Sequence, residues 1–280
     1  MSLVLKRKLP VNRSLDQVYN HYLVEKSIAD RIKASNRGER KLIFASMYDE
    51  LFSKVPDHPR LTRRKSEEET RRENKTKYSI LRRYLRSSSV VVEFASGDCR
   101  FSYEISKYAK FVYGVDISDQ RNPNDQNPDN FRLIVYDGYS LPEVESNSCD
   151  AIFSYQLIEH LPPEDTVEHF KLAHKILKAE GIYVFQTPHA FSGPHDISGF
   201  FCDEPEGFHL KEWTYKGMMS LIKGVGYKSF ISRIALPGID MRVPNKLFIF
   251  LEEILRLFPK KISRRISGRI IPNLYAVAVK

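Results

Sequence analysis

The spacing of apolar and polar residues changes near residue 88, and the two parts of the chain predict different elements. In the first part, Ser14 with Gln17 and Ser66 with Glu69 fit the capping box, in which paired side chains satisfy the free amides that begin a helix. The two prolines of VPDHPRLTRR break helix and predict a loop. Helices are therefore predicted over 15–34, 38–53 and 66–87.

From residue 89 the chain carries short apolar runs that alternate with helical stretches. These runs are SVVVEF, FVYGVDI, FRLIVYD, CDAIFSY and GIYVFQT. They are continuously apolar, as is typical of parallel strands that helices cover on both faces. The pattern predicts an α/β protein with a doubly wound, mostly parallel sheet.

Composition is consistent with a globular protein, and charge divides the chain into three parts. The 280 residues are 42% hydrophobic, enough to bury a full core. Lys and Arg exceed Asp and Glu by 22 to 11 in residues 1–88 and by 9 to 2 in residues 241–280, whereas acids lead by 22 to 13 in residues 89–240. The basic flanks would attract nucleic acid, anionic lipid or an acidic substrate, or simply coat exposed helices.

The sequence also predicts a compartment. No window approaches the roughly 18 uncharged apolar residues of a membrane-spanning helix, and MSLVLKRKLP lacks the features of a signal peptide, so we expect a cytoplasmic protein. Cys99, Cys149 and Cys202 are odd in number and have no CxxC spacing. We expect them to be reduced and to form neither a disulfide framework nor a thiolate zinc site.

Ligands of a doubly wound sheet bind at the carboxyl ends of its strands. Asp116 ends the second run, 19 positions beyond Gly97, where a carboxylate would accept hydrogen bonds from a ribose. A dinucleotide turn needs G-x-G-x-x-G, but the matching positions here hold Ala95, Gly97 and Arg100, and the chain has no P-loop. A ligand with a ribose and an adenine but no phosphate fits this turn better, because it requires the absence of a side chain only at Gly97, where the backbone comes nearest to the ligand.

These residues, taken in order, resemble the class I S-adenosylmethionine-dependent methyltransferases. The resemblance rests on Glu93-x-Ala-x-Gly97-x-Cys99, Val115-Asp116, Tyr136-Asp137-Gly138 and CDAIFSYQLIEHLPPED. It is greatest to the small-molecule group that includes quinone-biosynthesis enzymes, and it covers residues 88–235 and LYAVAVK at 274–280. Where the family usually has glycine, this chain has Ala95 and Cys99.

The resemblance implies a Rossmann-like sheet of seven strands with an antiparallel last strand. It also implies an N-terminal helical lid over 1–87 and a methyltransferase domain over 88–280, with a helical insertion at 238–272. The cofactor would be S-adenosyl-L-methionine. The expected cofactor-binding residues are Glu93, Phe94, Ala95, Ser96 and Gly97 for the methionine moiety, Asp116 for the ribose, Ile117, Asp137 and Gly138 for the adenine, and Tyr155 and Gln156 for the methionine portion facing the acceptor.

The catalytic candidates are two histidines. His160 would act as a general base near neutral pH, or would instead pack the short helix that begins at Pro162. His209 would take part in catalysis or orient its loop through hydrogen bonds. The acceptor-binding candidates are Tyr22, His189, His195 and Trp213. No metal is predicted, because the histidine and aspartate spacings after the fifth run match no compact ligand signature.

The expected partner is a small-molecule acceptor, such as a secondary metabolite, a sugar or a lipid-like molecule, methylated on O, N or an activated C atom. The segment 245–269 joins an apolar run to five basic residues, and three interpretations of it stay open: packing within the fold or a homodimer, a wall of an apolar acceptor channel, or peripheral contact with an anionic membrane. No nucleic acid is expected, because the fourth run ends in SYQLIEH and no RNA-binding module is present. An RNA methyltransferase that uses its basic flanks is the alternative function.

Overall fold

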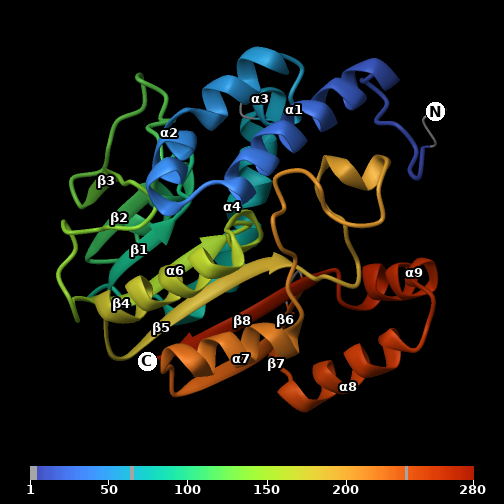
Figure 1. Cartoon of the computed structure of the whole chain (residues 1–280). Coiled ribbons are helices and arrows are strands. Elements are labelled where there is room, and N and C mark those ends of the chain that lie inside the picture. The colour runs from blue at the N-terminus through green and yellow to red at the C-terminus, as the bar shows by residue number, and fades with distance from the viewer. Residues whose placement is uncertain (1–4, 64–65, 237–238) are drawn as a thin grey trace.

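The computed structural model describes residues 5–63, 66–236 and 239–280, which fold around one eight-stranded sheet (Figure 1). Its strands are β1 (Val90–Phe94), β2 (Phe111–Asp116), β3 (Phe131–Val135), β4 (Cys149–Tyr155), β5 (Leu177–Pro188), β6 (Ser229–Leu236), β7 (Ile239–Arg242) and β8 (Asn273–Val279). The α-helices are α1 (Leu15–Ala34), α2 (Arg37–Lys54), α3 (Pro59–Arg63), α4 (Glu67–Leu81), α5 (Arg100–Ser106), α6 (Pro163–Ile176), α7 (Tyr215–Val225), α8 (Asn245–Arg256) and α9 (Lys260–Ile270).

The strands lie in the order β3-β2-β1-β4-β5-β8-β6-β7. The pairs from β3 through β5 are parallel, and β8 pairs antiparallel with both β5 and β6. The predicted doubly wound sheet with an antiparallel last strand is therefore confirmed. The sheet has one strand more than the seven predicted, because Ile239–Arg242 turns back along β6 and pairs with it at the outer edge.

Helices bury both faces of the sheet, which explains why its strands are continuously apolar. Along β1, Val91 faces the layer that contains α4 and α5, whereas Val92 and Phe94 face the layer that contains α6 and α7. All three side chains are fully buried. A parallel strand enclosed in this way has no polar face, so its sequence shows no alternation.

The helices of the first 63 residues lie over the ends of the strands, and the helix after them does not. Figure 1 shows α1 and α2 above the arrowheads of β1 and β4. Both helices begin with a capping box, the predicted one at Ser14 and a second at Asn36. The helix predicted over 66–87 instead joins a face of the sheet, where Ile80 and Leu81 pack in the core beside α5.

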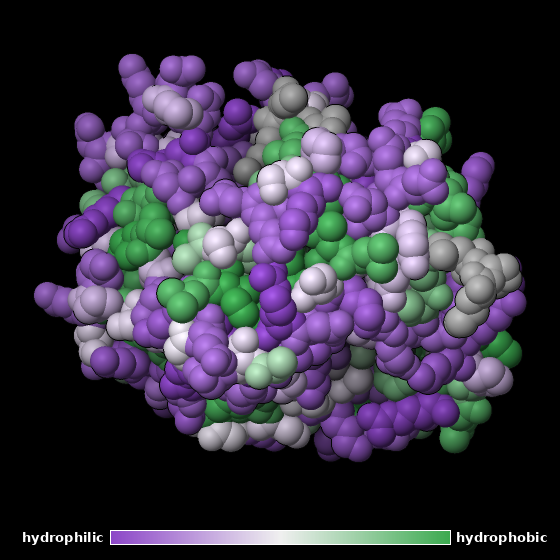
Figure 2. All heavy atoms as spheres, turned by 45° about the horizontal axis from the view of Figure 1, so that its top comes forward, coloured by the Kyte–Doolittle hydropathy of each residue, from purple (hydrophilic) through white to green (hydrophobic). Residues whose placement is uncertain are grey.

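The region predicted as a helical insertion contains a short strand and two helices. Residue 238 lies outside the described residues, β7 follows, and α8 and α9 come before β8. Figure 2 brings the top of Figure 1 forward and shows a mainly hydrophilic surface with scattered apolar patches. Among the described residues, no helix is long and apolar enough to cross a membrane.

Candidate active site

The turn after β1 follows a left-handed backbone at three positions. The φ angles are +57° at Ala95, +57° at Gly97 and +63° at Cys99. Glycine adopts this conformation without penalty, whereas a residue with a side chain loses about 1–2 kcal/mol there. The turn thus has the backbone of the glycine-rich motif even where alanine and cysteine replace the glycines.

The carboxylate of Asp116 holds this turn in place. Its Oδ2 accepts a hydrogen bond from the Gly97 amide at 2.8 Å, and its Oδ1 accepts longer ones from the Ser118 amide and from Gln120 Nε2, both at 3.3 Å. Burial raises the pKa of Asp116, against the opposing effect of the Gly97 amide and of Arg60. The predicted ribose-binding residue therefore links the ends of β1 and β2.

Glu93 is a buried acid at the end of β1. Its side chain is 1% exposed and accepts a hydrogen bond from the Ser102 hydroxyl. Burial raises the pKa of Glu93 to about 7, although Lys77 and Ser102 act in the opposite direction. An ammonium group bound beside this carboxyl would stabilise its charged form. Phe94 and Ser96, the other buried residues predicted here, pack in the core and against the turn.

Arg60, which the sequence analysis did not single out, lies over the same turn. A Cβ atom added at Gly97 would lie 3.6 Å from Arg60 Nη2, and the guanidinium is 5.0 Å from the centre of the Tyr48 ring. Burial acts to lower the pKa of Arg60, but Tyr48, Asp116 and Asp98 outweigh it and raise this pKa. The sequence signal that could have pointed to Arg60 is Pro59, because a proline at the first position of a helix fixes where α3 begins.

The predicted adenine-binding residues lie beneath α2. Asp137 Oδ1 accepts the amides of Tyr139 and Ser140 at 2.9 and 2.8 Å, and its Oδ2 pairs with Lys41 Nζ at 2.5 Å. Burial acts to raise the pKa of Asp137, yet Lys41 and the amides lower it. Gly138 has a φ of +87°, and a Cβ there would lie 3.1 Å from the ring of Phe44. Ile117 packs in the cluster that contains Phe44.

Tyr155 and Gln156 end β4 beside β5. The Gln156 backbone is left-handed, with a φ of +55°, and its amide donates to the Gln186 carbonyl at 3.0 Å. Its side-chain Nε2 donates to Gln186 Oε1 at 2.7 Å. Lys77 Nζ lies 5.5 Å from the centre of the Tyr155 ring. Gln186 Nε2 is itself buried and has no partner among the described residues.

The two catalytic candidates lie together with Glu159. The rings of His160 and His209 have centroids 5.1 Å apart, and Glu159 Oε1 is 3.9 Å from His160 Nε2. Glu159, His160 and His209 each offer a ligand atom, and these atoms lie within 4.8 Å of one another. Glu159 lies within the run CDAIFSYQLIEHLPPED, which carries the resemblance, but no role was predicted for it. His209 follows His160 by 49 positions, a separation that no spacing rule for metal or catalytic residues covers.

Burial and charge give the two histidines different protonation states. Burial and the neighbouring His209 lower the pKa of His160 to about 3, so its ring is neutral and a weak base. At His209 burial acts in the same direction, but Glu212, Glu159 and Asp196 outweigh it and raise the pKa to about 9. Burial raises the pKa of Glu159 to about 7.

The predicted acceptor-binding residues are dispersed. The Tyr22 hydroxyl donates to Glu206 Oε2 at 2.7 Å and thereby joins α1 to the loop after β5. His189 is fully buried, with one nitrogen 2.9 Å from Glu252 of α8 and the other 3.3 Å from Ser267 of α9, so it fastens the C-terminal helices. His195 is exposed and bonds Ser192 at 2.7 Å. Trp213 is buried, and its indole Nε1 has no partner among the described residues.

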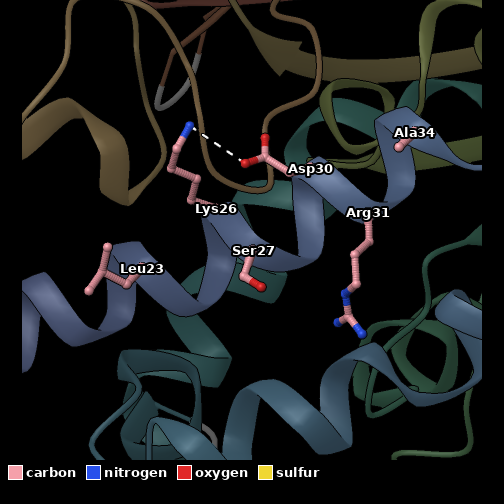
Figure 3. Close-up of a pocket in the computed structure, with 6 residues that line it drawn as sticks. All are labelled: Leu23, Lys26, Ser27, Asp30, Arg31 and Ala34. Carbon is pink, nitrogen blue, oxygen red and sulfur yellow. Dashed lines mark ion pairs between the residues drawn. The ribbon is translucent and has the colours of Figure 1, made fainter.

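Two surface hollows lie away from this cluster. One, of about 510 Å³, runs along a single face of α1 (Figure 3) and is lined by Leu23, Lys26, Ser27, Asp30, Arg31 and Ala34. The other, of about 520 Å³, lies between α4 and α5 and includes Arg71 and Arg100. Because residues of one helix alone line the first hollow, it is an open groove and does not bring together functional side chains from different elements.

The strand order, the antiparallel last strand and the turn after β1 define the class I methyltransferase fold. Residues 92–185 match the family model described as a methyltransferase domain. The match confirms the resemblance to class I S-adenosylmethionine-dependent methyltransferases of the small-molecule group, whose cofactor is S-adenosylmethionine. No curated protein matches the chain.

Solved structures share the fold at low sequence identity. Phosphoethanolamine N-methyltransferase 1 of Haemonchus contortus, solved with phosphoethanolamine and S-adenosylhomocysteine, is 15% identical with a TM-score of 0.57, over 88% of this chain and 50% of that one. The 1,6-didemethyltoxoflavin-N1-methyltransferase of Burkholderia thailandensis is 13% identical with a TM-score of 0.52, over 88% and 91%. An S-adenosylmethionine-dependent methyltransferase of Archaeoglobus fulgidus is 18% identical with a TM-score of 0.50, over 74% and 94%.

Proposed function

We propose that this protein transfers a methyl group from S-adenosylmethionine to an oxygen, nitrogen or activated carbon atom of a small-molecule acceptor. The observation that carries the proposal is the left-handed turn at Gly97. The amide of Gly97 donates a hydrogen bond to Asp116, and the Arg60 guanidinium lies next to Gly97. S-adenosylmethionine, when bound, supplies an electrophilic methyl group on a positively charged sulfur. The protein supplies binding, orientation and exclusion of water.

The charges around the turn match the two ends of the methionine moiety. Glu93 is a buried carboxyl that an ammonium group would ionise, and Arg60 is a permanent cation that would pair with a carboxylate. Asp116 Oδ1 accepts long hydrogen bonds from the Ser118 amide and from Gln120, both at 3.3 Å, which ribose hydroxyls would replace. Ile117, Asp137 and Gly138 would enclose the adenine beneath α2.

Unpartnered polar atoms favour an acceptor that offers a hydrogen-bond acceptor of its own. Gln186 Nε2 and Trp213 Nε1 are buried donors without a partner among the described residues. A buried donor left unpaired costs about 1–3 kcal/mol, which a bound ligand would recover. Tyr155 and Gln156 would lie between these donors and the cofactor, while Tyr22 and His195 would border the acceptor from α1 and the loop after β5.

Calorimetry with S-adenosylhomocysteine tests cofactor binding directly. We expect the wild type to bind, and Arg60→Ala and Asp116→Ala to weaken Kd by about 10- to 100-fold, because each removes a charge-assisted contact. Arg132→Ala, which removes an exposed arginine of β3, is the matched control and should bind as the wild type does. A wild type that folds but binds neither S-adenosylhomocysteine nor S-adenosylmethionine would overturn the proposal.

We also propose that α8 and α9 contact an anionic membrane surface. Leu247, Phe250 and Ile254 of α8 and its C-cap residue Leu257 recur at helical spacing. Three of them are strongly exposed, at 57%, 64% and 83% for Leu247, Phe250 and Leu257. A second row of α8, with Phe248 and Leu255, fills the core. Figure 2 shows apolar and hydrophilic atoms intermixed at the lower right margin, the side on which Figure 1 places these helices.

The same two helices carry exposed basic side chains, of which Lys260 also pairs with Glu204 and Arg256 lies 3.8 Å from Glu253. The basic side chains are Lys246, Arg256, Lys260, Lys261, Arg265 and Arg269, all exposed. An apolar row flanked by cations fits the interface of a bilayer that contains anionic lipid, where acyl chains meet phosphates. The charges favour such a surface over a second copy of the chain, which would bring the same cations together.

Vesicle flotation separates these partners. The wild type should float with vesicles of phosphatidylcholine and 30% phosphatidylserine, and Phe250→Ser with Leu257→Ser should abolish flotation without changing the melting temperature. Leu42→Ser, which changes an exposed leucine on α2, is the control. Concentration-dependent dimers that the double variant dissociates, without flotation of the wild type, would assign this surface to self-association.

A further inference from the structure

One buried acid in the candidate site has an oxygen that the described residues leave unpaired. Glu159 is fully buried; its Oε2 accepts a hydrogen bond from the Thr187 hydroxyl at 2.8 Å, whereas its Oε1 has no hydrogen-bond partner. An unpaired carboxylate oxygen in the interior is unfavourable unless a ligand satisfies it.

Two imidazoles lie near that carboxyl group, and each has one nitrogen engaged elsewhere. His160 Nδ1 lies 2.9 Å from the Phe208 carbonyl, which leaves Nε2 on the side of Glu159, 3.9 Å from Oε1. His209 Nδ1 lies 2.8 Å from Glu212 Oε1, which leaves its Nε2 for a ligand. Histidine ligands of metals are held in this way, with the second nitrogen bonded to a carbonyl or carboxylate that fixes the tautomer.

The geometry points to a divalent transition-metal ion bound by Glu159, His160 and His209. The three candidate atoms lie within 4.8 Å of one another, and atoms bonded to one ion at about 2.1 Å can be at most about 4.2 Å apart. A small inward shift of the side chains therefore closes the site. Two imidazole nitrogens and one carboxylate oxygen suit Zn²⁺, Fe²⁺ or Mn²⁺, and three protein ligands leave positions for others.

The carboxyl groups around the three residues favour a cation, although the Arg60 guanidinium also acts on His160. Glu212 and Asp196 both contact His209, the first through its ring and the second through its amide, and Glu159 supplies a third carboxyl group. Another cluster with the same composition, His21, Glu25 and His58, differs in this respect. There Glu25 already bonds His21 and the Phe208 amide, and Arg13 lies 2.9 Å from His21. In that cluster both oxygens of the acid already have partners, and Arg13 bonds one of the imidazoles directly.

The metal site narrows the acceptor class, a step that rests on the proposed function. An ion at the end of β4 would take an acceptor hydroxyl as a further ligand and would lower the pKa of that hydroxyl. The hydroxyl would then release its proton to solvent. His160 and His209 would accordingly be metal ligands, with no role as general bases. The acceptor group would be an oxygen, and a phenol or catechol would suit it best.

Metal analysis of the full chain tests the site without any assay of activity. After dialysis against Zn²⁺, Mn²⁺ or Co²⁺, we expect one equivalent of metal per chain in the wild type, and at least tenfold weaker binding in Glu159→Gln and His160→Gln. His174→Gln and His58→Gln should bind as the wild type does. Melting curves in EDTA show whether each variant folds, and added metal should raise the melting temperature of the wild type and of both controls only.

Several outcomes would overturn the inference. They are a wild type without stoichiometric metal, folded Glu159→Gln and His160→Gln variants that keep it, and loss of metal in His58→Gln. Catechol should shift the visible bands of Co²⁺-loaded protein, and an unchanged spectrum would overturn the oxygen-acceptor part. Calorimetry with S-adenosylhomocysteine in EDTA is independent of the metal, so a failure of the proposed function and a failure of the metal site give different results.

Discussion

At the scale of single residues, the turn at 95–99 keeps a glycine-type backbone without its glycines. Ala95 and Cys99 both have positive φ angles, and each retains a Cβ that this conformation disfavours. The turn persists because Asp116 holds the Gly97 amide and the strands on either side are buried. A local preference is thus outweighed by contacts from the second strand.

Ala95→Gly should therefore stabilise the protein. Relief of the left-handed strain exceeds the added flexibility of the unfolded chain, so we expect the free energy of unfolding to rise by about 0.5–1 kcal/mol. Ala45→Gly, at an exposed helical position of α2, is the control and should lower it by about 1 kcal/mol. Urea denaturation measures both. A loss of stability in Ala95→Gly would mean that the methyl group is needed for packing.

Glu93 should make stability depend on pH. Its pKa rises from 4.5 in the unfolded chain to about 7 in the folded one, because burial disfavours the charged form. The folded state holds the proton more tightly, so this contribution is complete below pH 4.5 and is lost as pH rises through 7. Over that pH range, the free energy of unfolding of the wild type should fall by roughly 3 kcal/mol at most relative to that of Glu93→Gln.

Denaturation curves of the wild type and Glu93→Gln from pH 4.5 to 8 measure this difference. Glu68→Gln, an exposed position of α4, serves as the control and should run parallel to the wild type. If the stability of Glu93→Gln also runs parallel to that of the wild type between pH 4.5 and 8, Glu93 is ionised over this whole range. Bound S-adenosylmethionine should reduce the slope, because its ammonium group would favour the carboxylate.

At the scale of elements, one buried arginine fastens α2 to α6. Arg40 Nη1 bonds Asp165 at 2.9 Å, its Nη2 bonds Glu164 at 2.5 Å, and its Nε donates to the Ile32 carbonyl at 3.1 Å. Tyr139 also donates to Asp165, at 2.7 Å. This network fixes α2 over the end of β3, where the adenine would bind.

Arg40→Ala should be strongly destabilising, because it leaves the buried Asp165 without its cation. We expect a loss of about 3–5 kcal/mol in the free energy of unfolding. Arg37→Ala is the matched control on the same helix; its side chain is 52% exposed, 3.8 Å from Glu168, and its loss should cost less than about 1 kcal/mol. Thermal and urea denaturation would compare the two, and equal effects would show that the contacts of Arg40 contribute little.

At the scale of the whole molecule, the three charge regions of the sequence meet. Basic residues of both flanks pair with acids of the middle part, and the pairs are Lys6 with Asp203, Arg40 with Asp165, Lys41 with Asp137, Arg83 with Asp240, Lys260 with Glu204, and Arg264 with Asp203. Part of the positive charge of the flanks, which could attract nucleic acid, is therefore neutralised by ion pairs within the fold.

These pairs predict weak binding to RNA. At 150 mM salt, a gel shift with single-stranded RNA should show a Kd no tighter than about 1 μM, the range of non-specific electrostatic binding, and the complex should dissociate as salt rises. Tighter binding that resists salt would instead favour the alternative of an RNA methyltransferase. Lysozyme, another small basic protein, is a suitable reference for non-specific attraction.

The sequence by itself determined the strands of the core sheet and the acids at their ends. Runs such as VVVEF need no distant information, because a buried parallel strand is apolar throughout. The predicted helices at 15–34 and 38–53 agree with α1 and α2 to within a residue, since capping side chains act locally. Asp116 and Gly97, 19 positions apart, were predicted together because parallel strands end at the same edge.

Only the tertiary structure decided which distant residues meet. Arg60 reaches Gly97 from a short helix, β7 pairs along β6 as the eighth strand, and His209 joins Glu159 and His160 from a loop after β5. His189, predicted as an acceptor-binding residue, bonds Glu252 of α8 and lies 3.3 Å from Ser267 of α9. Packing places such side chains through contacts across the fold, and the spacing of residues along a chain carries no record of those contacts.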